Sequence, residues 1–234
     1  MSEWWTYRAE DFLLFSPRVY WRMFELHNAA LWPLHVLTLA AGLIIIIIII
    51  IAWRPGTSAR WIAFILAMLW ILIGWSFLWN RYATINWAAA YIAPAFFAEG
   101  ALLIVVSLLN GLAFNRRGPA GWIGYLILAF ALAGQPLLAP LLGRSWASSE
   151  VFGIAPDPTA IATLGVLLLA RGRLWPWLLP IPVLWCLLSG MTLRTMGEPQ
   201  AWAPYAALAL AAAAWIGTII RQRGIKENRT CAPK

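Results

Sequence analysis

The sequence contains few of the side chains from which catalytic and metal sites are usually built. Its 234 residues include two histidines, two cysteines, two aspartates and two lysines, and both lysines lie in the C-terminal tail. Haem held between helices needs histidines on different helices, whereas His27 and His35 lie on or near one helix. The cysteines, Cys186 and Cys231, provide neither a disulfide framework nor a paired thiol ligand set. A retinal Schiff base is excluded because no lysine lies in an apolar stretch.

Short motifs of common enzyme sites are also missing. There is no His-Glu-x-x-His pair, no Gly-x-Ser-x-Gly elbow and no glycine-rich phosphate loop. We therefore predict no cofactor, no metal site and no catalytic residue, and the sequence favours a non-enzymatic role over an enzymatic one.

Charge is scarce as well. Charged residues make up 11% of the chain and hydrophobic residues 62%, with a mean hydropathy of +0.75. A soluble domain has about 25% charged and roughly 45–50% apolar residues, and a disordered chain has still fewer apolar ones. Both classes are excluded. The net charge of +8 does not indicate a nucleic-acid partner here, because cytoplasmic loops of membrane proteins are enriched in Lys and Arg. The predicted partner is the lipid bilayer.

Seven apolar stretches predict an all-α bundle of transmembrane helices. A helix needs about 20 residues to cross the roughly 30 Å core of a bilayer, and the fifth stretch, at only 13 residues, reaches about 20 Å. It either begins earlier, through 151–155, or re-enters the membrane, so seven spans are favoured and six remain open. The stretches are 31–53, 61–79, 88–114, 120–142, 158–170, 174–193 and 201–220.

The distribution of Lys and Arg predicts the orientation of the bundle. With seven spans, one face carries six of these residues and the other, which includes the C-terminal tail, carries eleven. The short loops along the chain then carry, in alternation, two Lys or Arg residues and one. Since the richer face is usually cytoplasmic, we expect the C-terminus inside and the N-terminus outside.

The chain divides into an N-terminal segment (1–30), the bundle (31–220) and a polar tail (221–234). Ser16 and Pro17 form a helix-start signal, and Pro33 breaks the chain before the first span. Between them, charged and apolar residues lie on separate helical faces, which predicts an amphipathic helix at the membrane interface. The charged face holds Arg18, Arg22 and Glu25, and the apolar face holds Tyr20, Phe24 and Leu31.

Ionisable groups inside a bilayer are costly and are functional candidates. Glu99 lies near the middle of the third span, and Asn110 returns to almost the same helical direction. Glu99 is either a proton- or cation-binding group or a neutral carboxyl that hydrogen bonds to a neighbouring helix. His35, Gln135 and Asn86 lie in the outer half of the same topology. With Glu99 they either line a cavity open to the outside or form scattered interhelical hydrogen bonds.

A second group of polar residues is predicted at the outer face. It comprises Arg81, Asp157 and Thr159. The run Pro156-Asp157-Pro158-Thr159 is typical of a helix start, with Asp157 as the cap and Pro158 as the first helical residue.

Three segments of the sequence resemble the recurring blocks of a bacterial inner-membrane family catalogued as a domain of unknown function. They are 11–17 (DFLLFSP), 81–87 (RYATINW) and 151–160 (VFGIAPDPTA). Members of that family are often labelled permease. The resemblance covers nearly the whole chain and implies a multi-pass protein of the bacterial inner (plasma) membrane, without an activity or ligand that transfers.

Three functions follow from these observations. The first is a small permease or ion-coupled carrier with Glu99 as its mid-membrane carboxylate. The second is a non-catalytic subunit or assembly factor of a larger membrane complex, because the surface is so apolar and aromatic; a homo-oligomer is the alternative assembly. The third is a lipid-binding or lipid-modifying enzyme that uses the outer polar residues. The substrate is not defined by the sequence.

Overall fold

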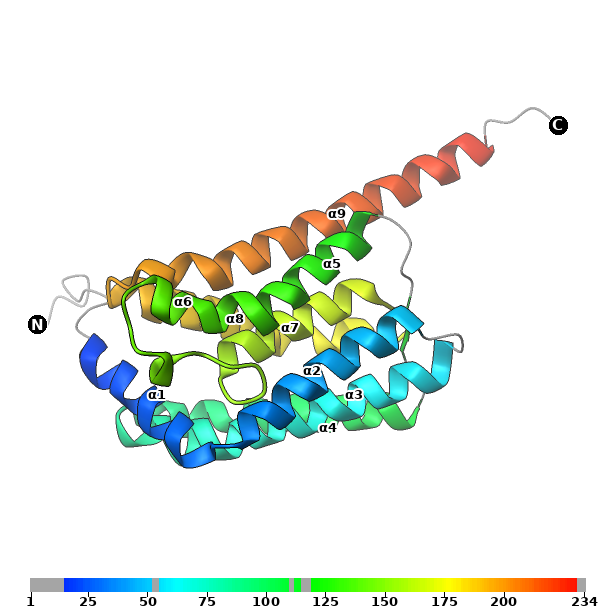
Figure 1. The fold of residues 1–234 in the computed structure, drawn as a ribbon. Helices are drawn as coiled ribbons and strands as arrows, with labels where there is room; N and C mark the ends of the chain where they lie inside the picture. The colour runs from blue at the N-terminus through cyan, green and yellow to red at the C-terminus, as the bar shows by residue number, and fades with distance from the viewer. Residues whose placement is uncertain (1–14, 52–54, 110–111, 115–118, 231–234) are drawn as a thin grey trace, which may run out of the picture.

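A computed structural model of the protein describes residues 15–51, 55–109, 112–114 and 119–230. These residues form a bundle of helices with one small two-stranded sheet (Figure 1). Six helices are long and apolar enough to cross a membrane. The predicted all-α transmembrane bundle is confirmed, and its six long apolar helices are those of a multi-pass membrane protein.

The helices follow the apolar stretches of the sequence. The main ones are α2 (Leu34–Ile51), α3 (Pro55–Ile73), α4 (Ala88–Leu108), α5 (Pro119–Ala129), α8 (Pro180–Thr195) and α9 (Trp202–Thr230). Two π-helical turns extend them: η3 (Gly74–Trp79) continues α3, and η5 (Phe130–Gly134) joins α5 to α6 (Gln135–Leu141). The remaining helical elements are α1 (Pro17–Leu31), α7 (Pro156–Leu169), η4 (Tyr82–Thr84), η6 (Trp146–Ser148), η7 (Trp175–Leu178) and η8 (Pro199–Ala201).

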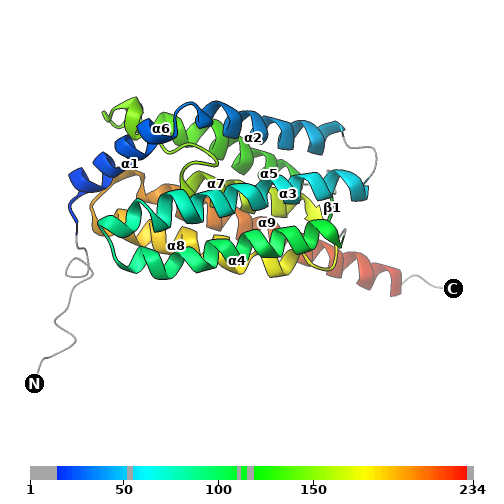
Figure 2. The ribbon, with the colours of Figure 1, turned by 90° about the horizontal axis from the view of Figure 1, so that it is seen from below.

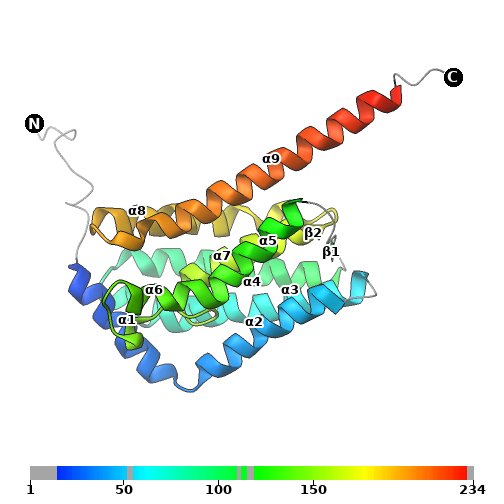
Figure 3. The ribbon, with the colours of Figure 1, turned by 45° about the horizontal axis from the view of Figure 1, so that its top comes forward.

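The bundle has two ends, which we name by the elements found there. At the α1 end, α1 lies beside the connections that contain η4, η6 and η8 (Figure 2). At the strand end, β1 (Ala113–Phe114) pairs antiparallel with β2 (Ala170–Arg171) (Figure 3). Helix α9 extends past the strand end, so α1 and the last turns of α9 lie at opposite ends.

The chain runs between these ends seven times, and the fifth run differs from the others. Residues 142–150 lie at the α1 end, the chain enters the bundle at Val151, and only the 14 residues of α7 are helical. The non-helical residues 151–155 supply the rest of this run. The fifth apolar stretch is therefore short because its first part is not helical, which also explains why six helices reach full membrane length.

The start of α1 agrees with the prediction. The Ser16 hydroxyl accepts a hydrogen bond from the Val19 N–H at 3.4 Å, and Pro17 is the first helical residue. The apolar face of α1 packs on the bundle, with Tyr20 and Phe24 buried. Its charged face is exposed, and there an ion pair joins Arg22 and Glu25, with the nitrogen and oxygen 2.6 Å apart.

Two helix ends differ from the prediction. Helix α4 ends at Leu108, because Ala113 and Phe114, which the sequence placed in the third span, pair with Arg171 and Ala170. Helix α9 continues to Thr230, well past residue 220, and so includes much of the segment separated as a polar tail.

Helix α7 occupies the centre of the bundle. All 14 of its residues are buried, and it contacts α3, α5, α8 and α9. Its closest backbone approach is to α5, where a Cβ atom on Gly165 would lie 2.9 Å from the Gly124 carbonyl oxygen. Small residues allow such close packing between helices in lipid. This contact sets the position of α7 between the two ends of the bundle, and therefore the position of the polar groups at the beginning of α7.

Exposed tryptophans mark both ends of the bundle. Amphipathic indole rings collect at the headgroup level of a bilayer, so the part between the two groups is the part covered by lipid. At the α1 end they are Trp32, Trp75, Trp79, Trp87, Trp146 and Trp202, with Trp75 four residues before Trp79 in η3, and at the strand end Trp61, Trp122 and Trp177.

Gly153 turns the chain into the bundle at the start of the fifth run. Its φ is +77°, in the left-handed region that favours glycine. A Cβ atom at this position would lie 2.7 Å from Thr38 Cβ and 2.9 Å from Leu69 Cδ2. Both the backbone conformation and the packing therefore require glycine here.

We expect Gly153→Ala to destabilise the protein more than the matched change Gly143→Ala. Gly143 also has a positive φ, +76°, but among the described residues nothing beyond its chain neighbours lies within 4 Å of where a Cβ atom would stand. Both changes lower the free energy of unfolding by about 1–2 kcal/mol, because alanine is strained in the left-handed region. Gly153→Ala lowers it by about 1–3 kcal/mol more, because the added methyl group overpacks the site. Thermal unfolding in one detergent measures the difference; equal shifts in midpoint would show that Thr38 and Leu69 yield without cost.

Candidate functional site

Helix α1 holds the non-helical part of the fifth run in place. The His27 ring donates from Nε2 to the Ile154 carbonyl at 3.3 Å. The Asn28 amide donates to the carbonyls of Ala147 and Ser149 at 2.7 and 2.8 Å. His35, one of the sequence-predicted site residues, donates from Nε2 to Asn28 Oδ1 at 3.2 Å. The two histidines therefore have structural partners at the α1 end.

Thr159 is a structural residue of the same turn. Its hydroxyl accepts from the Gly153 N–H at 2.8 Å and donates to the Ala155 carbonyl at 2.9 Å. The side chain is fully buried. Thr159 thus shapes the chain just before α7, and its buried hydroxyl is used by the backbone of this turn.

Asp157 binds the neighbouring helix α8. Its Oδ1 accepts from Trp185 Nε1 at 2.8 Å, and its Oδ2 accepts from the Ser189 hydroxyl at 2.6 Å. The prediction that Asp157 caps a helix beginning at Pro158 is wrong, because α7 begins at Pro156 and its N-cap residue is Ala155. Two donors on α8 draw the carboxylate sideways, away from the helix end.

Glu150 is a second buried carboxylate just outside the fifth run. Its Oε2 accepts from Gln200 Nε2 at 2.7 Å, whereas Oε1 has no hydrogen-bond partner among the described residues. Burial, together with the nearby charge of Asp157, raises the pKa of Glu150 to about 8, against the opposing influence of Arg144 and Gln200. The free oxygen and the raised pKa both favour the protonated form of Glu150.

Arg144 connects this carboxylate to the surface. Its Nη2 donates to Gln200 Oε1, so a chain of hydrogen bonds runs from Arg144 through Gln200 to Glu150. The guanidinium carbon lies 3.4 Å from the centre of the Trp21 ring, a cation–π contact. Partial burial lowers the pKa of Arg144, but an arginine remains charged at any physiological pH.

A small cavity of about 80 Å³ lies beside the Asp157 partners. Ser189 and Trp185 form one wall, and Tyr20 and Tyr82 belong to the same lining. Burial raises the pKa of Tyr20, as do the nearby charges of Asp157 and Glu150, so its hydroxyl shares the surroundings of both carboxylates. The cavity has room for a few water-sized molecules.

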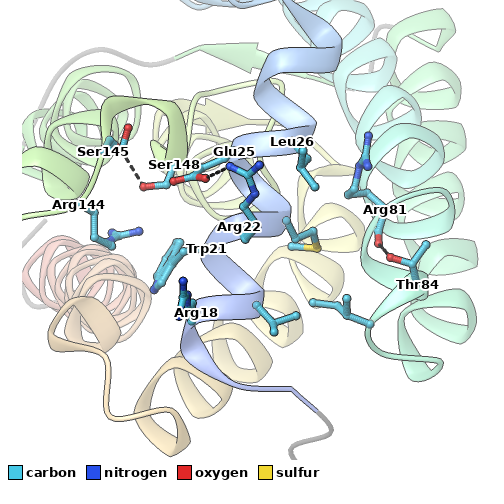
Figure 4. Close-up of a pocket in the computed structure, with 13 residues that line it drawn as sticks. Arg18, Trp21, Arg22, Glu25, Leu26, Arg81, Thr84, Arg144, Ser145 and Ser148 are labelled. Carbon is cyan, nitrogen blue, oxygen red and sulfur yellow. Dashed lines mark hydrogen bonds and ion pairs between the residues drawn. The ribbon is translucent and has the colours of Figure 1, made fainter.

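A much larger hollow lies outside, over the exposed side of α1 (Figure 4). We call it the outer hollow; its volume is about 760 Å³. Arg18 and Arg22 come from α1, Arg81 from the turn after η3, and Arg144 from the turn after α6 (Figure 4). Among the sequence-predicted residues, Arg81 is the one that lines this hollow.

The other sequence-predicted residues do not gather into one site. Asn86 lies two residues before α4, where its Oδ1 accepts from the Ala88 N–H at 3.1 Å, and it also lines the small cavity. Glu99 and Gln135 are buried, and none of their side-chain oxygen or nitrogen atoms has a hydrogen-bond partner among the described residues. Neither lines the small cavity or the outer hollow. Asn110 lies outside the described residues.

The central residues of the site were missed in the sequence. Glu150, Arg144 and Gln200 lie in two different connections, and Trp185 and Ser189 lie within an apolar helix. One signal was present: Ser148-Ser149-Glu150 is a polar run directly before an apolar segment, and it holds one of only nine acidic residues in the chain. In the part of the chain that the structure describes, no three His, Cys, Asp or Glu side chains are grouped to hold a metal ion.

Comparison with known families gives one match. Residues 17–224 match the family described as Family of unknown function (DUF6064). Because the match covers most of the chain, the protein belongs to this family, which confirms the resemblance to an uncharacterised family. No curated protein and no solved structure gives a match.

We expect the stability of the protein to fall as the pH is lowered from about 6.5 to 4. Burial lowers the pKa of His27 from 6.5 to about 4, so the unfolded chain binds a proton in this range that the folded protein does not. The loss reaches about 3 kcal/mol when the pH falls below both pKa values. In His27→Gln, which keeps a donor for Ile154 but does not titrate, this part of the loss should disappear. Unfolding midpoints of both proteins at pH 4 and 7.5 measure it; identical pH dependence would show that His27 is not the group responsible.

Proposed function

We propose that this member of the DUF6064 family is a small proton-coupled permease, and that Glu150 and Asp157 bind the proton. The observation that carries the proposal is the broken fifth run, which has one buried carboxylate, Glu150, just before it and a second, Asp157, at the beginning of the short helix α7 in the centre of the bundle. In lipid, non-helical backbone is tolerated where it is buried in protein or lines a water-filled cavity. In transporters, interrupted helices mark the substrate and ion sites.

The electrostatics of the pair support proton binding. Each carboxylate is buried, and in the described residues neither forms an ion pair with a cationic side chain. Two buried like charges disfavour each other, so one proton held by the pair relieves both. Asp157 is stabilised as an anion by Trp185 and Ser189. Glu150, with one free oxygen, is then the group that holds the proton at neutral pH.

The site has an exit on one side. Glu150 connects through Gln200 to Arg144 at the surface, and Asp157 connects through Ser189 to the small cavity. Towards the strand end, by contrast, α7 is packed on all sides. A carrier alternates between access from each side, and in this proposal the bundle is in the state that opens towards the α1 end.

Glu99 is the second candidate for the proton-binding group. It is fully buried in α4 and has no hydrogen-bond partner among the described residues. We rank it below Glu150 because it borders neither the small cavity nor the outer hollow, so a proton has no polar route to it.

We infer the orientation from the charges at the two ends. The strand end holds Arg60, Arg171 and Arg173, and the basic C-terminal segment follows there. By the positive-inside rule, the strand end faces the cytoplasm and the α1 end faces outward across the bacterial inner membrane. The proposed site then opens to the outside.

Cysteine labelling tests the proposal without knowledge of the substrate. In a Cys186→Ala, Cys231→Ala background, Thr192→Cys reports on the small cavity and Thr163→Cys on the middle of α7. We expect a membrane-impermeant maleimide to label the cysteine at 192 from the α1 side and the cysteine at 163 from the strand side. A carrier opens to one side of the membrane and then to the other, so each cysteine becomes accessible in turn. Raising the pH from 6 to 9 passes the pKa of Glu150 and should change the ratio of the two rates at least tenfold. The two positions differ in burial, and burial raises the pKa of a thiol, so the carboxyl-to-amide variants are needed to separate this change from the pH dependence of the thiol reaction itself.

Matched carboxyl-to-amide changes identify the proton-binding group. Glu150→Gln should remove this change, and Asp157→Asn, which takes away a charge that raises the pKa of Glu150, should move it to lower pH, whereas Glu99→Gln should leave it intact. If only Glu99→Gln removed it, the proton would bind at Glu99. A Thr163→Cys protein that never reacts from the strand side would overturn the permease, and a second polypeptide that co-purifies at fixed stoichiometry would favour a subunit of a larger complex.

A further inference from the structure

Among the described residues, the outer hollow is lined by more positive than negative side chains. Four arginines line it, with Glu25 as the one acidic residue. Glu25 pairs with Arg22. Among the described residues, Arg18, Arg81 and Arg144 have no carboxylate within ion-pair distance. Three cationic side chains therefore border one concave surface at the α1 end.

Arg144 is held rigidly in this hollow. The Trp21 ring lies against its guanidinium, and Gln200 accepts from Nη2. Nε and Nη1 are buried and have no hydrogen-bond partner among the described residues, so an anion reaches them only if the side chains that cover them shift. A guanidinium fixed by stacking loses little conformational freedom when it binds an anion, and arginine matches the geometry of phosphate oxygens.

The hollow lies at the depth of lipid headgroups. Exposed Trp146 follows Arg144 almost directly, and exposed Trp79 and Trp87 flank Arg81 in the sequence. Indole rings favour the headgroup region. Apolar side chains also line the hollow: Val19 and Leu26 are each 44% exposed. Cationic and apolar groups side by side suit an amphiphile better than a fully hydrated ion.

We propose that the outer hollow binds the headgroup of an anionic phospholipid, with Arg18, Arg81 and Arg144 supplying the positive charge of its lining and Val19 and Leu26 against the start of the acyl chains. This inference does not depend on the permease proposal. It concerns a surface site, and Glu150 and Asp157 take no part in it.

Binding of soluble short-chain lipids tests the site on the full-length protein in detergent. The ligands are dihexanoyl phosphatidylglycerol, dihexanoyl phosphatidylcholine and inorganic phosphate, measured by isothermal titration calorimetry. We expect the glycerol lipid to bind at least tenfold more tightly than the choline lipid, since the choline headgroup carries its own positive charge. Inorganic phosphate should bind more weakly than the glycerol lipid, because it lacks the apolar part.

Three arginine variants locate the binding. Arg144→Gln should weaken the affinity for the glycerol lipid at least tenfold. Arg81→Gln should weaken the same affinity several-fold. This second variant is included because it leaves the contact between Arg144 and Gln200 intact. Arg194→Gln is the matched control: it removes the same charge at the same end from an exposed position that does not line the hollow.

The outcomes separate the alternatives. Equal affinity for the two lipids, or equal losses in Arg194→Gln and Arg144→Gln, would overturn the site, because general charge attraction would then explain the binding. Phosphate binding as tight as the glycerol lipid would overturn the lipid assignment and leave a site for free phosphate.

Discussion

Between Val151 and Ala155 the backbone enters the bundle without forming a helix, and its polar groups must find partners inside the protein. An unpaired buried group costs a few kcal/mol, and lipid offers no replacement. The N–H groups of Ile154 and Ala155 donate to the Val151 carbonyl, and that of Gly153 donates to Thr159. The Ile154 carbonyl accepts from His27. The place of α7, and of the carboxylates near its beginning, depends on these few bonds.

This arrangement separates two kinds of buried carboxyl group. Asp157 and Glu150 lie where the helix is interrupted, and each accepts hydrogen bonds from a neighbouring element. Glu99 lies inside a regular helix with no partner among the described residues. Near the interruption, side chains of α8 and η8 donate hydrogen bonds to Asp157 and Glu150. Around α4, none of the described side chains donates a hydrogen bond to Glu99. A polar site in a bundle this apolar therefore requires a break in a helix.

The sequence predicted the fold better than the site. The positions of the apolar stretches, the start of α1 at Ser16 and the short fifth stretch follow from local composition, since each depends on residues adjacent in the chain. The partners of Asp157 could not be predicted, because Trp185 and Ser189 look like ordinary members of an apolar helix. Glu150 and Gln200 are 50 residues apart, and only the packing of the bundle brings them together. Sequence reasoning favoured Glu99 because depth in a span can be counted, whereas proximity between spans cannot.

The bonds between α1 and the fifth run also order events during synthesis. Asn28 binds a carbonyl 121 positions later in the chain, and His27 binds one 127 positions later. At roughly 5–20 residues per second, α1 leaves the ribosome on the order of ten seconds before its partners exist. Four membrane helices are inserted in that interval. Among the described elements, helix α1 is thus made first but forms these bonds only after the fifth run has been made, and until then this end of the newly inserted bundle is uncovered.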